Sequence, residues 1–538
     1  MFNHHTRAVL MSLAVFALLA IAHTWPLAEA PSHWSRVDGD GGMNTWTVSW
    51  VAHALLTNPA HLFDANIFHP HKLTLAYSEA MLVQSMFALP VIAAGGSAVL
   101  AYNVAMIAGF ALTGWAFCLL LRRWTGSWAA GYAAGSLAAF NSYTLVNLTH
   151  QQYLHAGFYA VMLLAIDRLI VEPRYRDAGW LAIAFVLQGL ASLYLMAFAM
   201  FTLIFLLLSR VREWITRTVP LLKTLAVTGI IALVLLWPYL SPYRRLQATM
   251  NQTRSVGDAE SASWTNYLST GARLHDQRWS RQYGVTATSY MFPGFGALVL
   301  VIVAFSDQRQ RRDPRVQMCA AAAAGCVAVS FAPSWPVFPA LHAAIPLFQV
   351  IRAVHRIAQV MLLMVAVLAG FGVSVLWHRW RGSRLWPGAA VAIVLAINGE
   401  AMRAPIGFVW FDRVPKVYDV LAADPGAVIV ETPFPMPQQW FLNGLYMVNS
   451  TAHWRPMLNG YSSYLPGSYY ADYEIMQKFP SPASLIALHE RGVTHVVVHQ
   501  AALNTGAPAG SYDPYESVAS LRLIARDDDV LIYRIVGH

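Results

Sequence analysis

Two aspartates separated by one glycine stand in the stretch RVDGDGGMNTW, residues 36–46. Asp38 and Asp40 are two positions apart, so in an extended or turn segment their carboxylates project roughly to the same side. The glycines around them allow a tight turn and a close approach to a ligand. Carboxylates held in this way can deprotonate a hydroxyl group, bind a divalent cation or orient a nearby group. Asp-Gly is also common in ordinary turns, so the spacing alone leaves both interpretations open.

Two arginines form a second group, in the stretch QVIRAVHRIAQ, residues 349–359. Arg352 and Arg356 are four positions apart, so in a helix they would share one face, where two guanidinium groups can hold a phosphate through forked hydrogen bonds. His355 stands between them and is included in this candidate phosphate site. The competing interpretation is that the arginines reach toward lipid headgroups.

Histidine and glutamine residues gather in NLTHQQYLH, residues 147–155. His150 and Gln151 are candidate substrate-binding residues, with His155 close behind them. A histidine at the end of a membrane span is also a common packing or headgroup residue, so the stretch is weaker than the two charged groups.

A metal site is a further possibility for the acidic pair. His69 and His71, in the stretch IFHPHK, could join Asp38 and Asp40 around a divalent cation such as Mg²⁺ or Mn²⁺. His69 is also a candidate substrate-binding residue. No fixed metal-ligand spacing supports this set, and whether a metal is needed stays open.

The composition indicates what must position these residues. Of 538 residues, 57% are hydrophobic and only 12% are charged, which is typical of a membrane protein. Apolar stretches long enough to cross a bilayer, about 20 residues each, recur up to about residue 402 and then stop. The sequence therefore predicts a membrane domain over residues 1–402 and a soluble domain over residues 403–538.

The basic residues predict the orientation, because cytoplasmic loops of membrane proteins are enriched in lysine and arginine. The clusters at 122–123, 174–176, 210–212, 309–315 and 379–384 all fall on one side if the amino terminus is cytoplasmic. We interpret the apolar opening stretch as an uncleaved anchor. This anchor is the first of eleven expected spans, at about 8–25, 98–121, 127–143, 156–171, 178–192, 194–209, 219–240, 289–306, 316–333, 357–377 and 386–402. This arrangement puts the protein in the cytoplasmic membrane with the carboxy-terminal domain outside.

The first outer loop, about residues 26–98, should contain helices at the membrane surface. Trp46, Trp50 and His53 recur at helical spacing, and tryptophan favours the interface because its ring is apolar while its N–H still reaches water. The run 81–96 is short and contains Pro90, so we expect an interfacial or re-entrant helix there. The alternative for the tryptophan helix is simple packing on the bundle.

The tail changes character from apolar spans to short β-rich runs. Strands are expected at AVIVETPF (427–434), THVVVHQ (494–500) and VLIYRIV (530–536), and a helix at SPASLIALHERG (481–492), with Gly492 as its C-cap. A small α/β domain is the natural prediction. The three cysteines, Cys118, Cys319 and Cys326, lie in apolar runs and should be core residues.

One stretch of the tail, STAHWRPMLNGYSSY at 450–464, is rich in aromatic and hydrogen-bonding side chains. His453, Trp454 and Arg455 could bind a sugar, since aromatic rings with a polar edge suit carbohydrates. The stretch could equally fasten the tail to the membrane bundle, and we favour this second interpretation because Arg455-Pro456 and Gly460 indicate a fixed loop.

These features together resemble the GT-C class of integral-membrane glycosyltransferases, which includes protein O-mannosyltransferases and the aminoarabinose transferases of lipid A. Residues 101–143 resemble their second and third spans, although Asn141-Ser142-Tyr143 departs from the motif that ends the third span there. The chain is more similar to a large group of uncharacterised bacterial membrane proteins assigned to the class. These share "GD" after the first span, "FHP" (Phe68-His69-Pro70), two arginines four apart and the 450–464 stretch.

The resemblance implies an inverting glycosyltransferase that moves a sugar from a polyprenyl-phosphate donor to a glycan, lipid or protein acceptor at the outer membrane surface. Asp40 or Asp38 would then be the base that activates the acceptor. Arg352 and Arg356, with His355, would stabilise the departing phosphate, where charge develops in the transition state.

Other classes of function remain as alternatives. A transporter or flippase of a lipid-linked or sugar substrate would show matched, broken helices in two halves, and no such repeat is visible. A non-catalytic membrane scaffold is a third possibility. Nucleotide-driven chemistry is disfavoured, because there is no Walker loop or dinucleotide-binding glycine motif. The net charge of +9 lies in the basic loops, so membrane lipids and no nucleic acid are the expected partners.

Overall fold

The computed structural model describes residues 4–37, 39–250, 255–285, 289–345, 348–349, 351–503, 513, 515–527 and 529–536. The chain folds into two compact units, each made of two separate segments. The helical unit comprises Met1–Glu29 and Ala105–Gly407, and the mixed unit comprises Ala30–Val104 and Phe408–His538. The expected division at 402/403 put the first outer loop in the membrane domain. In the structure, residues 30–104 belong instead to the same compact unit as the tail.

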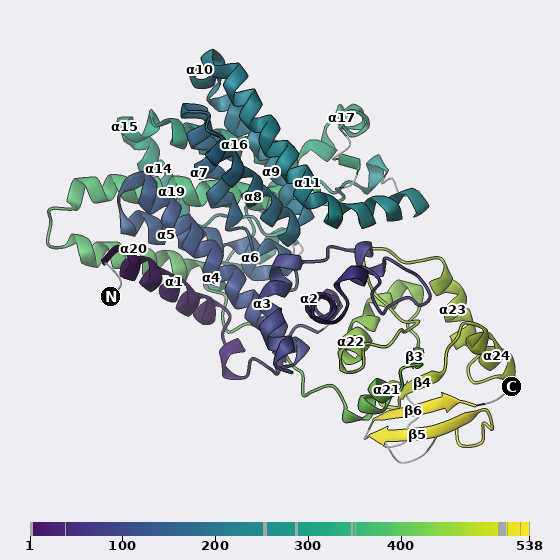
Figure 1. The fold of residues 1–538 in the computed structure, drawn as a ribbon. Helices are drawn as coiled ribbons and strands as arrows, with labels where there is room; N and C mark the ends of the chain where they lie inside the picture. Colours follow the sequence, from purple (N-terminus) through teal and green to yellow (C-terminus); the bar gives the residue numbers. More distant parts are fainter. Residues whose placement is uncertain are drawn as a thin grey trace. The chain divides into compact units, whose positions relative to one another are not determined.

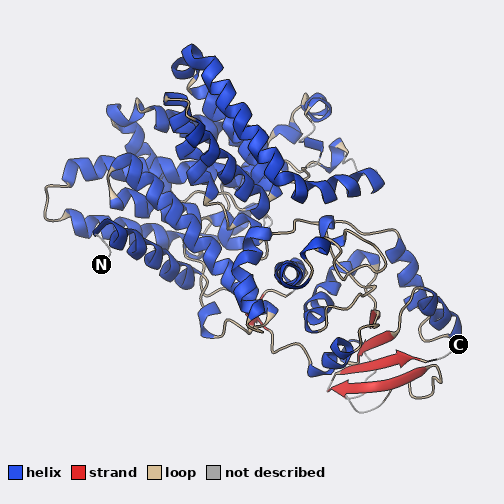
Figure 2. Cartoon of the chain, in the orientation of Figure 1, coloured by secondary structure: helices blue, strands red, loops and turns tan. Residues whose placement is uncertain are grey.

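The helical unit consists mainly of long apolar helices that lie side by side (Figures 1 and 2). Short helices and irregular segments connect α11 to α14 and α16 to α19. Local sequence explains several helix starts: the Ser127 side chain accepts a hydrogen bond from the first turn of α5, and Asp313 does the same for α16, with Pro314 at the first helical position. The helices are α1 His4–His23, α4 Ala98–Thr125 (whose first turns belong to the mixed unit), α5 Trp128–Ala139, α6 Ser142–Val146, α7 Phe158–Val171, α8 Tyr175–Ala191, α9 Leu193–Ser209, α10 Val211–Trp214, α11 Thr218–Met250, α12 Trp264–Tyr267, α13 Arg273–Asp276, α14 Phe295–Ser306, α15 Gln308–Arg311, α16 Pro314–Ser330, α17 Phe338–Ala344, α19 Ala358–Trp380 and α20 Trp386–Ala401.

The multi-pass helical fold predicted from the sequence is confirmed. Each of the eleven expected spans overlaps one of these helices over most of its length. Among the described residues, five helices are long and apolar enough to cross a membrane, over His5–His23, Ala98–Thr125, Gln151–Val171, Val211–Ala248 and Val354–Trp380. Three shorter apolar helices, α9, α14 and α20, coincide with further expected spans. The number of crossings and the orientation stay predictions.

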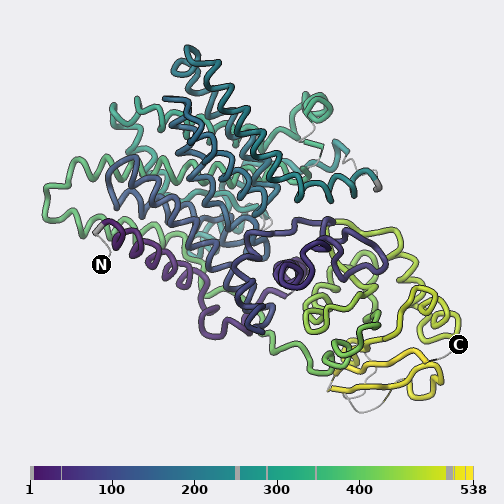
Figure 3. Tube along the Cα trace, viewed as in Figure 1, coloured from purple at the N-terminus to yellow at the C-terminus, as the bar shows by residue number. Residues whose placement is uncertain are grey.

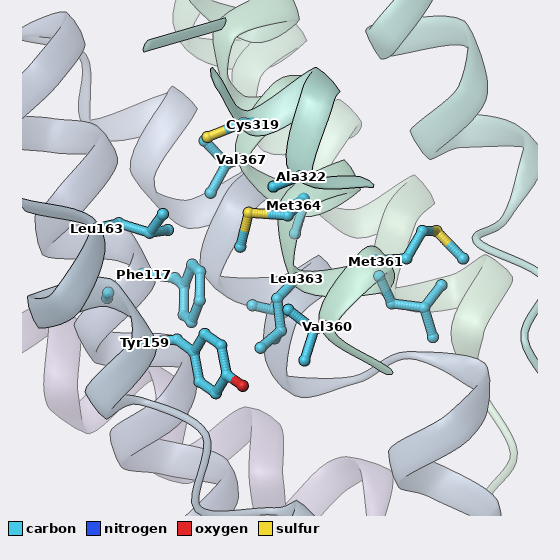
Figure 4. Packing of buried hydrophobic residues seen from close by; sticks show 14 of the residues in the cluster. Phe117, Tyr159, Leu163, Cys319, Ala322, Val360, Met361, Leu363, Met364 and Val367 are labelled. Carbon is cyan, nitrogen blue, oxygen red and sulfur yellow. The ribbon is translucent and has the colours of Figure 1, made fainter. Parts of the chain in front are cut away.

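The core of the helical unit lies around α19, which packs against α5, α14 and α16. Its residues 366–374 are all buried, because neighbours surround this part of the helix on every side. Figure 4 shows the packing, with Phe117 and Tyr159 facing Leu363 and Met364. The three cysteines are free and buried, as the sequence indicated.

The mixed unit joins the first outer loop to the tail. The long helix α2 (Asp40–Thr57) packs against α3 (Leu82–Ala93) from its own loop and against α22 (Asn443–Asn449) from the tail, so purple and green segments lie side by side in Figure 3. The two segments also share a small antiparallel sheet, in which β1 (Trp34–Ser35) pairs with β2 (Val409–Trp410).

The mixed unit also contains a four-stranded sheet, in the order β3 (Ile429–Thr432), β4 (His495–His499), β6 (Val530–Ile535) and β5 (Leu521–Asp527). The β3 and β4 strands are parallel, whereas β6 is antiparallel to both of its neighbours. The three expected strands correspond to β3, β4 and β6, and Gly492 follows α24 with a φ of 76° as a C-cap glycine does. The remaining elements are α21 Asp419–Ala423, β3 Ile429–Thr432, α23 Ser468–Met476, α24 Pro482–Glu490, β4 His495–His499, β5 Leu521–Asp527 and β6 Val530–Ile535.

The tryptophan helix differs from the expectation. Trp46 and Trp50 on α2 are only 2% and 8% exposed, so their rings do not reach an interface. Their indole N–H groups donate to protein acceptors, Trp46 to the Asn66 side chain at 3.1 Å and Trp50 to the Leu62 carbonyl at 2.9 Å. The helix predicted from the tryptophan spacing is present, but the tryptophans are buried in the protein instead of lying at the membrane surface.

Candidate active site

The acidic stretch forms a tight start to helix α2. Gly39 precedes the helix with a φ of 48°, in the left-handed region that favours glycine. A Cβ atom on Gly42 would lie 2.5 Å from the Val37 carbonyl oxygen and 2.8 Å from Gly444 on α22. The glycines therefore let the loop and the tail approach each other at the position where Asp40 enters the helix.

Asp40 is held by a residue from the far end of the sequence. The hydroxyl group of Tyr461 donates a hydrogen bond to Asp40 Oδ1. Trp440 packs edge-on against the Tyr461 ring, with 5.0 Å between the ring centroids. The carboxylate stays partly exposed to solvent. A carboxylate that is oriented and still accessible can act as a general base toward an incoming hydroxyl group. Asp38 lies outside the described residues.

The 450–464 stretch fastens the tail to the first outer loop. Asn66 donates from its side chain to Ser450 Oγ and to the Arg455 carbonyl, each at 3.2 Å. The backbone of Phe68 and its neighbour His69 donates to the carbonyls of Asn459 and Met457, at 3.2 and 2.9 Å. These contacts fasten the stretch to the first outer loop, within the mixed unit, whereas the role that we favoured, fastening the tail to the membrane bundle, stays a prediction.

The three candidate sugar-binding residues in this stretch make structural contacts. The Trp454 ring stacks on His53 of α2, with centroids 4.3 Å apart. Arg455 donates to the carbonyls of Leu421 and its neighbour Ala422, at 3.3 and 2.5 Å, which satisfies the end of α21. His453 is 4% exposed and accepts a hydrogen bond from the Arg455 backbone N–H at 2.9 Å. Burial lowers the pKa of His453 to about 3, and the charge on Arg455 adds to this effect.

His69 also lies in the mixed unit, half-buried against the turn after α24. Burial and the charge on Lys72 lower its pKa, which its hydrogen bond to the Arg491 backbone opposes. The ring is therefore neutral near pH 7. A neutral ring has one donor and one acceptor nitrogen, and a substrate contact of His69 stays a prediction.

In the helical unit, Arg356 is surrounded by aromatic rings. It donates from Nη1 to the Tyr153 hydroxyl at 2.7 Å, and its guanidinium carbon lies 5.6 Å from the Tyr153 ring centre and 5.8 Å from that of Tyr194. The Nε atom is buried and has no hydrogen-bond partner among the described residues. No carboxylate of the described chain lies within ion-pair distance of Arg356. An arginine with aromatic neighbours and no counter-ion is suited to bind an anion.

Arg352 has a different environment, and the shared helix face predicted for the two arginines is wrong. Helix α19 begins at Ala358, after a 3₁₀ turn over Val354–Ile357, and Arg352 lies in a bend before that turn. Its side chain is 52% exposed and pairs with Glu260, with 3.1 Å between Nε and Oε1. A four-residue spacing places two side chains on one face only within a continuous helix.

His355 is buried beside this bend. Its Nε2 atom lies 3.3 Å from Ser289 Oγ, and its Nδ1 atom lies 3.5 Å from Glu260 Oε2. Glu260 thus sits between His355 and Arg352, which leaves Arg356 as the candidate without an acidic neighbour.

The 147–155 stretch contacts Arg356 through Tyr153. The His150 ring lies 6.0 Å from the Tyr153 ring, so it belongs to the same aromatic group. Gln151 is fully buried. His155 is buried and lies 3.0 Å from the Ala105 carbonyl, which gives it a packing role.

A metal ion has no ready-made site in the described part of the chain. No group of three or more histidine, cysteine, aspartate or glutamate side chains is arranged there to hold one. Since Asp38 is not among these residues, the metal expected from the acidic pair stays a prediction.

Comparison with solved structures shows which fold this is. The arabinofuranosyltransferase AftD from Mycobacteria superposes with a TM-score of 0.58 and 14% sequence identity over 99% of this chain. ArnT from Cupriavidus metallidurans in the apo state superposes with a TM-score of 0.51 and 13% identity over 99% of both chains. ArnT bound to undecaprenyl phosphate superposes with the same TM-score and identity, over 99% of this chain and 98% of ArnT. The chain has the GT-C fold.

The GT-C fold is shared at low sequence identity. No family profile matches the sequence, and no curated protein is similar to it. The chain spans 40% of the length of AftD but nearly the whole of ArnT. The match therefore establishes the architecture, and the chemistry must be argued from this chain's own residues.

Sequence reasoning missed three residues that contact the candidates, Tyr461 in the mixed unit and Tyr153 and Glu260 in the helical unit. Tyr461 lies inside the 450–464 stretch and Tyr153 inside the 147–155 stretch, but neither was singled out. A buried or half-buried tyrosine needs a partner for its hydroxyl group, which could have drawn attention to both. Nothing in the sequence signalled Glu260, which pairs with Arg352 across 92 positions.

Proposed function

We propose that this protein is a glycosyltransferase that uses a polyprenyl-phosphate sugar donor and acts at the outer face of the cytoplasmic membrane. The observation that carries the proposal is the end-to-end match to ArnT, a protein solved with undecaprenyl phosphate bound. The oriented carboxylate of Asp40 and the arginine without a counter-ion, Arg356, are this chain's own support for it.

In this proposal, Asp40 is the general base. It removes the proton from an acceptor hydroxyl group as the oxygen attacks the anomeric carbon from the face opposite the leaving phosphate. The new glycosidic bond forms as the bond to the phosphate oxygen breaks, so the anomeric configuration inverts and the polyprenyl phosphate leaves with the bonding electrons. Tyr461 holds Asp40 Oδ1, which fixes the direction of the carboxylate.

Arg356 stabilises the leaving phosphate. Negative charge grows on the phosphate oxygen in the transition state, and a guanidinium group already fixed by Tyr153 stabilises that charge without reorganising. Arg352 and His355 are the secondary members of this group. Asp38 would support Asp40 or bind a divalent cation.

The experiment uses the purified protein in detergent and a panel of undecaprenyl-phosphate sugars labelled in the sugar. Release of undecaprenyl phosphate together with a labelled product from wild-type protein supports the transferase, and Asp40→Asn should abolish it. Asp412→Asn is the matched control, because Asp412 is an exposed carboxylate of the same unit.

The same preparation tests the alternative of a transporter or flippase. Reconstituted into vesicles, wild-type protein that moves the labelled lipid across the bilayer and forms no labelled product would contradict the transferase. Equal transfer by wild type and Asp40→Asn would show that Asp40 is not the base.

A further inference from the structure

An apolar groove runs along the outside of the helical unit. It has a volume of about 560 Å³, within the range of small-molecule sites. Four helices contribute to it: α1, α5, α19 and α20. The groove is lined almost entirely by apolar side chains, among them Val15, Trp128, Tyr132, Trp377, Val391 and Leu395.

The groove opens toward the surrounding medium. Val391 and Leu395, on its α20 wall, are 59% and 63% exposed. In a bundle that spans a membrane, such exposed apolar side chains face lipid, so an acyl chain can enter the groove from the side.

Two arginines stand over the aromatic walls at one end of the groove. Arg122 lies over the Trp128 ring, with 5.4 Å from its guanidinium carbon to the ring centre, and Arg381 lies over the Trp377 ring at the same distance. Arg122 uses one donor on the Gly126 carbonyl, and a guanidinium group has five donors. Both side chains therefore keep N–H groups for an anion.

The charge at this end is uncompensated. Helices α1, α4, α5 and α19 and the turn 381–385 contain no aspartate or glutamate, while arginines lie in the last turns of α4 and α19 and in the turn 381–385. On the neighbouring α16, Asp313 is already paired with Arg315 at 2.5 Å. On α20, Glu400 lies at the far end of the helix and caps α14 through the backbone of Phe295.

We propose that this groove binds one anionic glycerophospholipid of the surrounding bilayer. Its phosphodiester group pairs with Arg122 and Arg381, and one acyl chain lies in the apolar groove between Trp128 and Trp377. The charge favours an anionic over a zwitterionic lipid, because a net positive cluster next to the membrane attracts anionic headgroups. The site lies at the end of the bundle that the basic clusters predict to be cytoplasmic. It is separate from the proposed transfer reaction, and it does not depend on that reaction.

Native mass spectrometry of full-length protein released from nanodiscs tests the proposal. The nanodiscs contain equal amounts of dioleoyl phosphatidylglycerol and dioleoyl phosphatidylcholine. Wild-type protein should retain one phosphatidylglycerol in preference to phosphatidylcholine. The double variant Arg122→Gln/Arg381→Gln should lose this preference, by about fivefold for each arginine removed.

A matched control removes the same charge elsewhere. Arg176→Gln/Arg212→Gln changes two exposed arginines on α8 and α10, which do not line the groove, and should retain phosphatidylglycerol as wild type does. A second variant, Ala390→Trp, fills the groove with both arginines in place and should lose the bound lipid.

Three results would overturn the proposal. Equal loss of phosphatidylglycerol in Arg176→Gln/Arg212→Gln and Arg122→Gln/Arg381→Gln would show that only the net charge of the protein matters. Retention by Ala390→Trp would place the lipid elsewhere. Displacement of phosphatidylglycerol by an equimolar amount of undecaprenyl phosphate would identify the occupant as a polyprenyl lipid. Should the double variant fail to give a single size-exclusion peak, the single variant Arg381→Gln decides by the same criteria.

Discussion

Asp40 and Arg356 carry opposite charges and are positioned in opposite ways. Asp40 is positioned by backbone: glycines bring its loop against α22, and one hydroxyl group from Tyr461 orients the carboxylate. The Arg356 guanidinium group is positioned mainly by side chains, with the rings of Tyr153 and Tyr194 around it and a hydrogen bond to the Tyr153 hydroxyl group.

The difference shows what each position is suited to do. A base must keep one direction while a proton moves, and rigid backbone on both sides provides this. A phosphate receptor needs positive charge that no protein carboxylate neutralises, and Arg356 has this property whereas Arg352, paired with Glu260, does not. The variants below test whether these two roles are truly distinct, in order of decreasing expected effect.

Replacing Asp40 by asparagine should have the largest effect. The variant keeps the size of the side chain and removes the base, so kcat for sugar transfer should fall by about 10²- to 10⁴-fold. Initial rates with the labelled donor measure this, with Asp412→Asn as the control at wild-type rate. A fall below fivefold would remove Asp40 from the chemistry.

Replacing Arg356 by glutamine should lower kcat/KM for the donor by about 10- to 100-fold, since it removes the charge that faces the phosphate. Arg356→Lys should recover part of this loss, because an ammonium group keeps the charge without the planar fork. Arg352→Gln, which only breaks an exposed ion pair, should change kcat/KM by less than about fivefold. Similar losses at both arginines would mean that they act as one group, as the sequence first suggested.

Replacing Tyr461 by phenylalanine removes the hydrogen bond to Asp40 and leaves the ring in place. Hydrogen bonds to charged groups contribute about 1.5–3 kcal/mol, so we expect kcat to fall at least about tenfold with the donor KM unchanged. Tyr464→Phe is the control, since the Tyr464 ring packs on Tyr77 instead. A change in KM alone would indicate a binding role for Tyr461.

Replacing Gly42 by alanine should destabilise the mixed unit. Its new methyl group would lie 2.5 Å from a backbone oxygen, and overpacking of this kind costs about 1–3 kcal/mol. Gly467→Ala is the control, because a Cβ there meets no atom within 4 Å. Limited proteolysis of the two variants against temperature measures the effect, and equal melting would contradict the close approach of the loop to α22.

The pH dependence of stability should show the smallest effect. The folded protein holds His453 neutral, because burial lowers its pKa to about 3, whereas the unfolded chain binds a proton near its ordinary pKa of 6.5. The unfolded state therefore binds more protons between these values, and stability falls as the pH drops from about 6.5 toward 3. Between pH 7.5 and 5, the melting temperature of His453→Gln should fall by a few degrees less than that of wild type. The exposed control His489→Gln should show the same fall as wild type.

The sequence predicted the helices and strands better than it predicted which of them contact one another. The apolar helices and three strands of the tail follow from hydrophobic runs of the right length, which are local properties. Strand β5 was missed because LRLIARD mixes charged and apolar residues at an edge of the sheet, where one face is solvated. The pairing of β1 with β2 joins positions about 375 residues apart, and no local pattern signals such a contact.

The site was predicted in part, for the same reason. The identity of Asp40 and Arg356 as candidates follows from residue type and the scarcity of charge in an apolar chain. Their partners Tyr461 and Tyr153 come from distant segments, so sequence spacing could not find them. The i,i+4 argument for Arg352 depended on a helix that begins six residues later, and helix starts are the least certain part of a periodic pattern.

The mixed unit is built from residues 30–104 and 408–538, and this order of the chain has a consequence for biosynthesis. The segment with Asp40 is synthesised near the beginning, whereas its partners on α22 and Tyr461 are synthesised only after the last apolar helix. The loop that contains Asp40 therefore lacks its contacts with α22 and Tyr461 while the ribosome makes the helical unit. A nascent chain that stalls or is cut before about residue 461 lacks the hydroxyl group that orients the carboxylate, so Asp40 gains this partner only after the apolar helices have been made.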